Sequence, residues 1–191
     1  MAARRNFWNL MGAGQDNLES IAERVTKSAR AVKAEDIASG ITRQLGDQSI
    51  AAIYRDRVLS QRTRQYELHA PAKSPSVEIL HTLLGIELKI ANRRLLCPDL
   101  ATARYLSVFA RLGCDAIAVP YDITQISRLA DELECSWQRT MLLAQHFTAG
   151  RTARLRTAVT RHLLEEARNQ IAQLGAGTKF PQFNQRTRQR R

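Results

Sequence analysis

Three arginines in the last fifth of the chain, Arg154, Arg161 and Arg168, recur at intervals of seven residues. At 3.6 residues per turn, this interval places all three on one side of a helix. Arg151 lies close to the same line, and the apolar residues of the segment, Leu163 among them, fall opposite. Guanidinium groups in such a row can contact the phosphates of a nucleic acid. The spacing therefore predicts a helix that binds a polyanion.

The two ends of the chain combine arginines with aromatic side chains, a composition that does not fold by itself. We expect residues 1–14 to form an N-terminal arm and residues 175–191 a basic, flexible C-terminal tail. The predicted polyanion-binding residues are Arg151, Arg154, Arg161, Arg168, Arg186, Arg188, Arg190 and Arg191. The predicted partner-docking residues are Phe7, Trp8, Phe180 and Phe183.

Side chains that could support catalysis are scattered. The sequence contains no phosphate-binding glycine loop, no HExxH and no GxSxG motif. His81 follows Glu78 by three residues, a spacing compatible with acid–base chemistry on a helix, and Cys114 follows a glycine that can end a helix. We interpret His81 as a structural histidine and Cys114 as a small buried residue. The sequence therefore predicts a protein that is not an enzyme and binds no cofactor or metal.

Net charge is the feature that departs most from an average protein, at +11 over 191 residues. Residues 151–191 hold 10 basic and 2 acidic side chains, a net of +8. This excess indicates an anionic partner, either nucleic acid or an acidic protein assembly. Three cysteines without CxxC spacing favour a reducing cytoplasm. No apolar run is long enough to span a membrane.

The expected core element is a helix over residues 74–96. Ser74 is a suitable N-cap, Pro75 fits the first helical position, and apolar residues recur at helical intervals from Ile79 to Leu95. An apolar arc of this width is typical of a helix with neighbours on several sides. The sequence predicts an all-α fold, bundle-like or globin-like, with five to six helices over residues 15–174.

Other segments extend this prediction. Apolar periodicity indicates helices over residues 16–46, 47–58, 98–113, 122–147 and 150–174. Residues 116–119 read as a strand, Ala-Ile-Ala-Val, ended by Pro120. A lone strand must pair with another extended piece such as residues 66–69, pair with a partner, or serve as a link between helices. We favour the link.

Residues 88–91 and 95–99, followed by a helix that closes at Leu112 and Gly113, resemble the helix pair of the globin-like phycobiliproteins. The resemblance covers about thirty residues with gaps. Leu80 occupies the position that matches the pigment-bearing cysteine of that family. The resemblance therefore implies an assembly subunit to which no bilin is attached.

Two functions agree with these patterns. The first is non-catalytic binding to a nucleic acid backbone without strong sequence specificity. The second is a structural or linker-type subunit whose aromatic and basic termini dock into acidic proteins of a large assembly, with self-association possible. The arginine row contains no interleaved aromatic residues, which favours backbone contact in the first case, whereas the aromatic termini favour the second.

Overall fold

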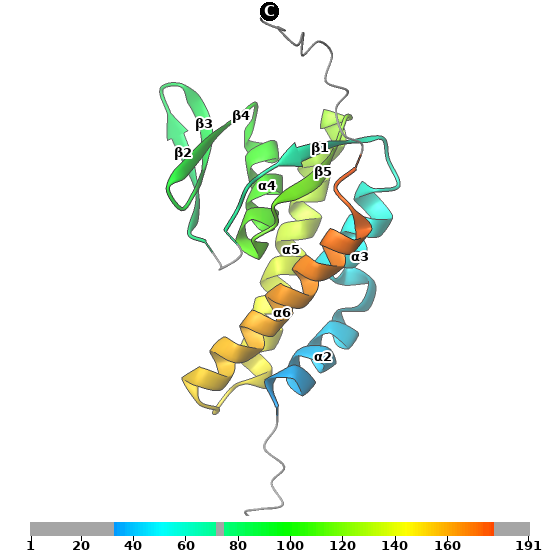
Figure 1. The fold of residues 1–191 in the computed structure, drawn as a ribbon, viewed down its shortest axis with the longest axis vertical. Coiled ribbons are helices and arrows are strands. Elements are labelled where there is room, and N and C mark those ends of the chain that lie inside the picture. The colour runs from blue at the N-terminus through cyan, green and yellow to red at the C-terminus, as the bar shows by residue number, and fades with distance from the viewer. Residues whose placement is uncertain (1–32, 72–74, 178–191) are drawn as a thin grey trace, which may run out of the picture.

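A computed structural model describes residues 33–71 and 75–177 and shows a mixed α/β fold (Figure 1). The helices are α2 (Ala34–Leu45), α3 (Ile50–Ile53), α4 (Leu100–Leu112), α5 (Ile123–Phe147) and α6 (Ala153–Leu174), with a 3₁₀ turn η1 (Gly46–Gln48) and a π-helical turn η2 (Tyr54–Val58). The strands are β1 (Thr63–Glu67), β2 (Val77–Thr82), β3 (Gly85–Ile90), β4 (Arg93–Cys97) and β5 (Ala116–Pro120). The prediction of an all-α fold is therefore wrong.

The error lies in the expected core helix over residues 74–96, which is instead an antiparallel meander of β2, β3 and β4. On the central strand, Ile86, Leu88 and Ile90 alternate toward the core while Glu87 and Lys89 take the other face. Apolar residues lie on both faces of these strands, and together they also recur at the intervals of three and four residues that are typical of a helix. The alternation of the strands, with a period of two residues, was therefore read as an apolar helical stripe. The resemblance to the phycobiliprotein helix pair fails for the same reason.

Two turns inside the expected helix make the meander possible. At the first, Thr82 Oγ1 accepts a hydrogen bond from the backbone N–H of Leu84 and donates one to the carbonyl of Gly85. Gly85 adopts a positive φ of 123°, which is accessible to glycine at little cost. The second turn passes through Ala91, also at positive φ, and Asn92. Gly85 and Asn92 were the local signals for two hairpins.

The strand at residues 116–119 is confirmed, but its expected role as a mere link is wrong. β5 pairs antiparallel with β1, so that Thr63 lies opposite Pro120 and Tyr66 opposite Ile117. This is the alternative in which the strand pairs with a nearby extended piece. The outer edge of β5 has no strand beside it in the described part of the chain.

The helices with clear capping residues are confirmed. α4 begins after Asp99, whose carboxylate accepts from the N–H of Thr102, and it ends at Gly113 in the left-handed conformation. α5 begins after Asp122, which caps the N–H of Thr124. The end of the first predicted helix at Gly46 is also confirmed, since α2 stops there; its residues before 33 lie outside the described part.

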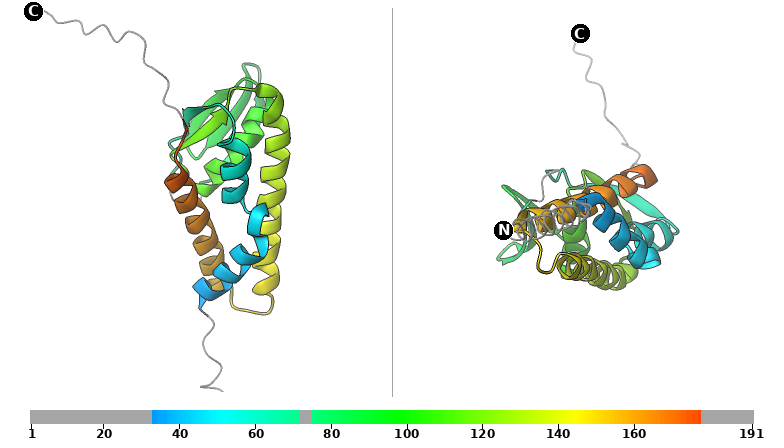
Figure 2. Two further views of the ribbon diagram at one scale, coloured as in Figure 1. Left: turned by 90° about the vertical axis from the view of Figure 1, so that its right-hand side faces the viewer. Right: turned by 90° about the horizontal axis from the view of Figure 1, so that it is seen from below.

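The two sheets lie at one end of the molecule, and helices α2, α5 and α6 pack against one another at the other end (Figure 2). α4 lies between the meander and α5 and contacts both. α6 packs its first half against α2 through Val159 and Leu163, and its second half against the main core through Ile171. No helix of the described ranges is long and apolar enough to cross a membrane.

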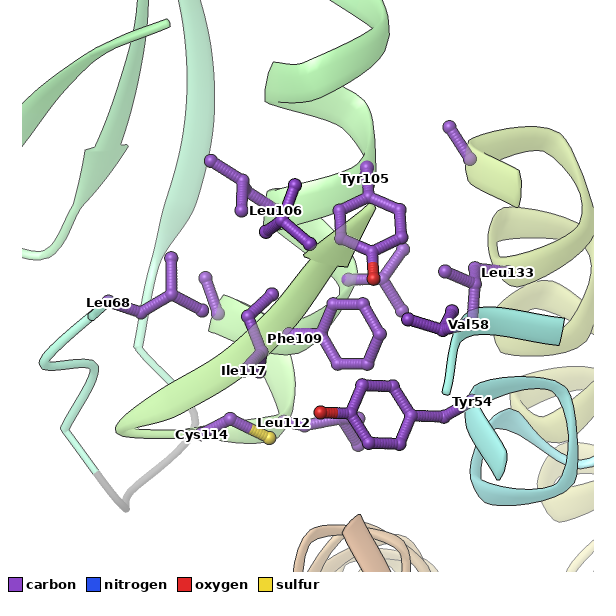
Figure 3. Close-up of a cluster of buried hydrophobic side chains, with 14 of the residues drawn as sticks. Tyr54, Val58, Leu68, Tyr105, Leu106, Phe109, Leu112, Cys114, Ile117 and Leu133 are labelled. Atoms are coloured by element: carbon purple, nitrogen blue, oxygen red, sulfur yellow. The ribbon is translucent and has the colours of Figure 1, made fainter. Parts of the chain in front are cut away.

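An aromatic cluster forms the centre of the core (Figure 3). The ring of Phe109 lies 5.5 Å from Tyr54 and 5.1 Å from Tyr105, between centroids. The Tyr54 hydroxyl accepts from the N–H of Ala118 at 2.8 Å and donates to the carbonyl of Gly175 at 2.7 Å. Tyr105 donates to the carbonyl of the same Ala118 at 2.7 Å. Burial raises the pKa of Tyr54 to about 12, so its hydroxyl remains a donor.

The variant Tyr54→Phe should lower the free energy of unfolding by about 1–3 kcal/mol, because it leaves a buried N–H and the carbonyl of Gly175 without partners. Urea denaturation followed by circular dichroism would measure this. Tyr121→Phe removes the hydroxyl of a partly exposed tyrosine and is the matched control, with an expected change within about 0.5 kcal/mol. Equal effects of the two substitutions would contradict the bridging role of the Tyr54 hydroxyl.

Candidate polyanion-binding surface

Arg154 and Arg161 project from one side of α6 and are exposed. The helix is continuous from Ala153 to Leu174, so seven residues separate the two Cα atoms by about 10.5 Å along its axis. The exposed Arg151 lies just before the helix, in the connection from α5. We call Arg151, Arg154 and Arg161 the α6 arginine surface.

Arg168 continues the row but lies in a different environment. It is half-buried, and its positive charge acts on the thiol of Cys114 at the end of α4. Around residue 168 the second half of α6 packs on the main core, whereas the first half packs on α2 and on the C-terminal part of α5 through a smaller cluster. Arg154 and Arg161 are thus exposed, whereas packing half-buries Arg168.

Four other arginines of the described residues are paired with nearby carboxylates. Arg104 on α4 pairs with Asp131 at 2.8 Å and with Glu134, both on α5. The remaining pairs join Arg55 to Asp56 at 2.7 Å, Arg128 to Glu132 at 3.0 Å and Arg94 to Glu87 at 3.5 Å. No carboxylate of the described residues forms an ion pair with the α6 arginine surface. Its charge is therefore available to a ligand.

Most of the positive excess lies outside the described ranges. Residues 33–71 and 75–177 hold 18 Lys and Arg against 15 Asp and Glu, a net of +3, while the full sequence carries +11. Arg186, Arg188, Arg190 and Arg191 belong to the remaining part of the chain, as do Phe7, Trp8, Phe180 and Phe183. Their predicted roles stay predictions.

The candidate acid–base pair of Glu78 and His81 is not assembled. Both residues lie on β2, where an odd separation places their side chains on opposite faces. Glu78 forms an ion pair with Lys89 at 3.0 Å. His69, by contrast, lies between two carboxylates that sequence reasoning did not connect with it, Glu67 at 3.1 Å and Asp115 at 3.2 Å. This exposed cluster links the ends of β1 and β5.

The next question is whether the described His, Cys, Asp and Glu side chains could bind a metal ion or act as thiolates. Over residues 33–71 and 75–177, no three His, Cys, Asp or Glu side chains are arranged to hold a metal ion. Burial raises the pKa of Cys114 to about 12 and also raises that of Cys97, so neither forms a thiolate at neutral pH. Cys135 is exposed in an open groove of about 640 Å³ between η2 and α5, beside both acidic and basic side chains.

An apolar tip is the surface feature that the sequence prediction missed. Leu83 and Leu84 form the turn between β2 and β3 and are 107% and 81% exposed. Leu96 on β4 is 62% exposed and lies beside Gly85, the residue that directly follows this turn. We call Leu83, Leu84 and Leu96 the leucine tip. It was missed because the predicted helix over residues 74–96 placed these leucines in the core.

In the native protein at pH 8, a disulfide reagent should modify one thiol per chain, Cys135, and all three in denaturant, because Cys97 and Cys114 are buried with raised pKa values. Release of the coloured leaving group counts the thiols. Cys135→Ser should abolish the rapid native reaction. A second thiol that reacts at a similar rate before unfolding would contradict the burial of Cys97 and Cys114.

Comparison of the chain with protein-family models, curated proteins and solved structures finds no match in any of the three. Among the exposed groups described above, the α6 arginine surface has the clearest ligand chemistry, since its cations form no ion pair with the described carboxylates and lie on or beside one side of a rigid helix.

Proposed function

We propose that the protein binds a nucleic acid backbone without strong sequence specificity and without catalysis. The observation that supports this function is the α6 arginine surface, whose exposed guanidinium groups form no ion pair with any carboxylate of the described residues. Unpaired guanidinium groups can bind phosphate oxygens in a bidentate manner and release condensed counterions.

The arrangement of the surface favours backbone contact over base recognition. The Cα atoms of Arg154 and Arg161 lie about 10.5 Å apart along a rigid helix, a distance comparable to the rise of about three base pairs, about 3.4 Å each, along the axis of a duplex. No aromatic residue lies between them in the sequence. Contacts of this kind position a protein on nucleic acid and carry no sequence information.

The proposal includes a reducing, cytoplasmic location. The three cysteines are free, two of them buried, and they form no disulfide in the structure. Disulfides are rare in the cytoplasm because thioredoxin and glutathione keep thiols reduced. The arginine-rich residues 186–191 would add to the electrostatic attraction of a polyanion from the C-terminal end of the chain.

A second candidate is a structural subunit of an assembly built from copies of this chain. The leucine tip favours it, because large exposed leucines on a protruding hairpin gain stability when they are buried against another apolar surface. Tip-to-tip contact about a two-fold axis is self-complementary, since each copy offers the same three leucines to its partner. Docking of Phe7, Trp8, Phe180 and Phe183 into acidic proteins stays an expectation from the sequence.

The double variant Arg154→Gln, Arg161→Gln should reduce the slope of log K against log salt by about 2 for duplex DNA, because two phosphate contacts are lost. Fluorescence anisotropy over a salt series measures this slope. The matched control is Arg55→Gln, Arg128→Gln, which removes the same charge from exposed but paired positions. Equal loss of slope in both variants would show that only net charge matters and would contradict a site on α6.

The double variant Leu83→Ser, Leu84→Ser should leave the thermal unfolding temperature and polyanion binding unchanged, because both side chains are exposed, and should reduce self-association. Sedimentation velocity over a concentration series provides the measurement. Ile123→Ser, at another strongly exposed apolar position, is the control. A monomeric wild-type protein at all concentrations would rule out the second candidate.

A further inference from the structure

Another arginine without an ion pair among the described residues, Arg62, lies at the end of the two-stranded sheet, remote in sequence from α6. The N–H of Tyr121 donates to the carbonyl of Arg62 at 3.1 Å, which extends the pairing of β1 and β5 by one step beyond Thr63 and Pro120. Arg62 and Tyr121 are therefore cross-strand neighbours with side chains on the same face. The Arg62 guanidinium lies 5.1 Å from the centre of the Tyr121 ring, within the range of a cation–π contact.

This pair is open to solvent. Tyr121 is 42% exposed, and Arg62 is exposed. No described carboxylate forms an ion pair with Arg62. The adjacent Asp122 is occupied, since its carboxylate accepts from the N–H and the hydroxyl of Thr124 at the start of α5.

The neighbouring arginine on β1 has an unsatisfied donor. Arg64 follows Arg62 by two residues and so lies on the same face of the strand. Its Nε is buried and forms no hydrogen bond within the described part of the chain. Buried donors without partners are rare in native proteins, and an anionic ligand is one explanation for such a group. The face therefore offers an aromatic ring together with two arginines.

The C-terminal segment reaches the same end of the sheet. A Cβ atom on Gly177 would lie 2.7 Å from Thr63 Oγ1, so this glycine packs directly against the residue that follows Arg62, on the opposite face of the strand. The Tyr54 hydroxyl holds the segment two residues earlier through the carbonyl of Gly175. The described C-terminal segment therefore packs on the face of β1 opposite Arg62.

We propose that Arg62 and Tyr121 form a stacking site for one base of a single-stranded nucleic acid, with a phosphate of the same strand bound by Arg62 and Arg64. This inference rests on the proposed function and specifies its ligand. Any base has a π-face that can stack on tyrosine or on a guanidinium plane, so the site needs no sequence preference. In a duplex these faces are covered by neighbouring base pairs, and the site is therefore selective for single strands.

The test compares the full-length wild type with Tyr121→Ala and Tyr121→Phe in binding to a labelled oligothymidylate and to a labelled blunt-ended duplex at physiological salt. Loss of a base–aromatic stack should weaken binding of Tyr121→Ala to the single strand by about 5- to 150-fold. Tyr121→Phe keeps the ring and should bind within about twofold of the wild type, because stacking does not need the hydroxyl. Duplex binding should be the same for all three proteins.

Ile123→Ala is the matched control, since Ile123 is 68% exposed and two residues from Tyr121. Single-strand affinity that is unchanged in Tyr121→Ala, equally reduced in Tyr121→Phe or equally reduced in Ile123→Ala would overturn the stacking site while the proposed function stands. A wild-type protein that binds neither oligonucleotide would overturn both. Thermal melting of each variant shows whether a loss of affinity reflects unfolding instead.

Discussion

The hydroxyl group of Tyr54 is the contact on which the arrangement of the domain depends. It joins three segments that are distant in sequence: η2, which carries it, the β5 residue Ala118, and Gly175 at the end of α6. Together with Tyr105 it satisfies both backbone groups of Ala118 on the side of β5 that has no neighbouring strand in the described structure. Two tyrosine hydroxyls thus take the place of a third strand. Such groups would otherwise be buried without partners, at a cost of about 1–3 kcal/mol each.

This constraint also positions the surfaces to which we assign function. α6 is held at its C-terminal end by Tyr54 and along its length by α2 and the main core, so its outer side has a fixed direction. Arg154 and Arg161 therefore project from a rigid support. The pairing of β1 with β5, which the tyrosines protect, is the same contact that brings Arg62 beside Tyr121.

Some arginines of the described residues form ion pairs within the molecule, and those of the proposed binding surfaces do not. α4 and α5 are joined by Arg104, Asp131 and Glu134, and the acidic outer side of α5 is thereby used within the molecule. The exposed arginines of α6 and of the β1 end have no such partners among the described residues. Because the described body carries a net of only +3, the position of its unpaired cations matters more than their total.

Local signals in the sequence determined several elements correctly. The helices predicted over residues 98–113 and 122–147 are present, and their ends at Asp99, Gly113 and Asp122 depend on capping contacts within one turn. The seven-residue spacing of Arg154, Arg161 and Arg168 likewise defined one side of α6. These features depend on short-range geometry, which a single segment contains in full.

Only the tertiary structure decided the rest. The residues from Val77 to Cys97 fit a helical stripe as well as a strand pattern, and the burial of Leu88 and Ile90 against α4 selects the meander. Packing on the core half-buries Arg168 while Arg161 remains exposed. Arg62 and Tyr121 become neighbours only through strand pairing across 59 positions. Such outcomes depend on contacts between distant segments, and the free energy of those contacts is not encoded in the periodicity of either segment alone.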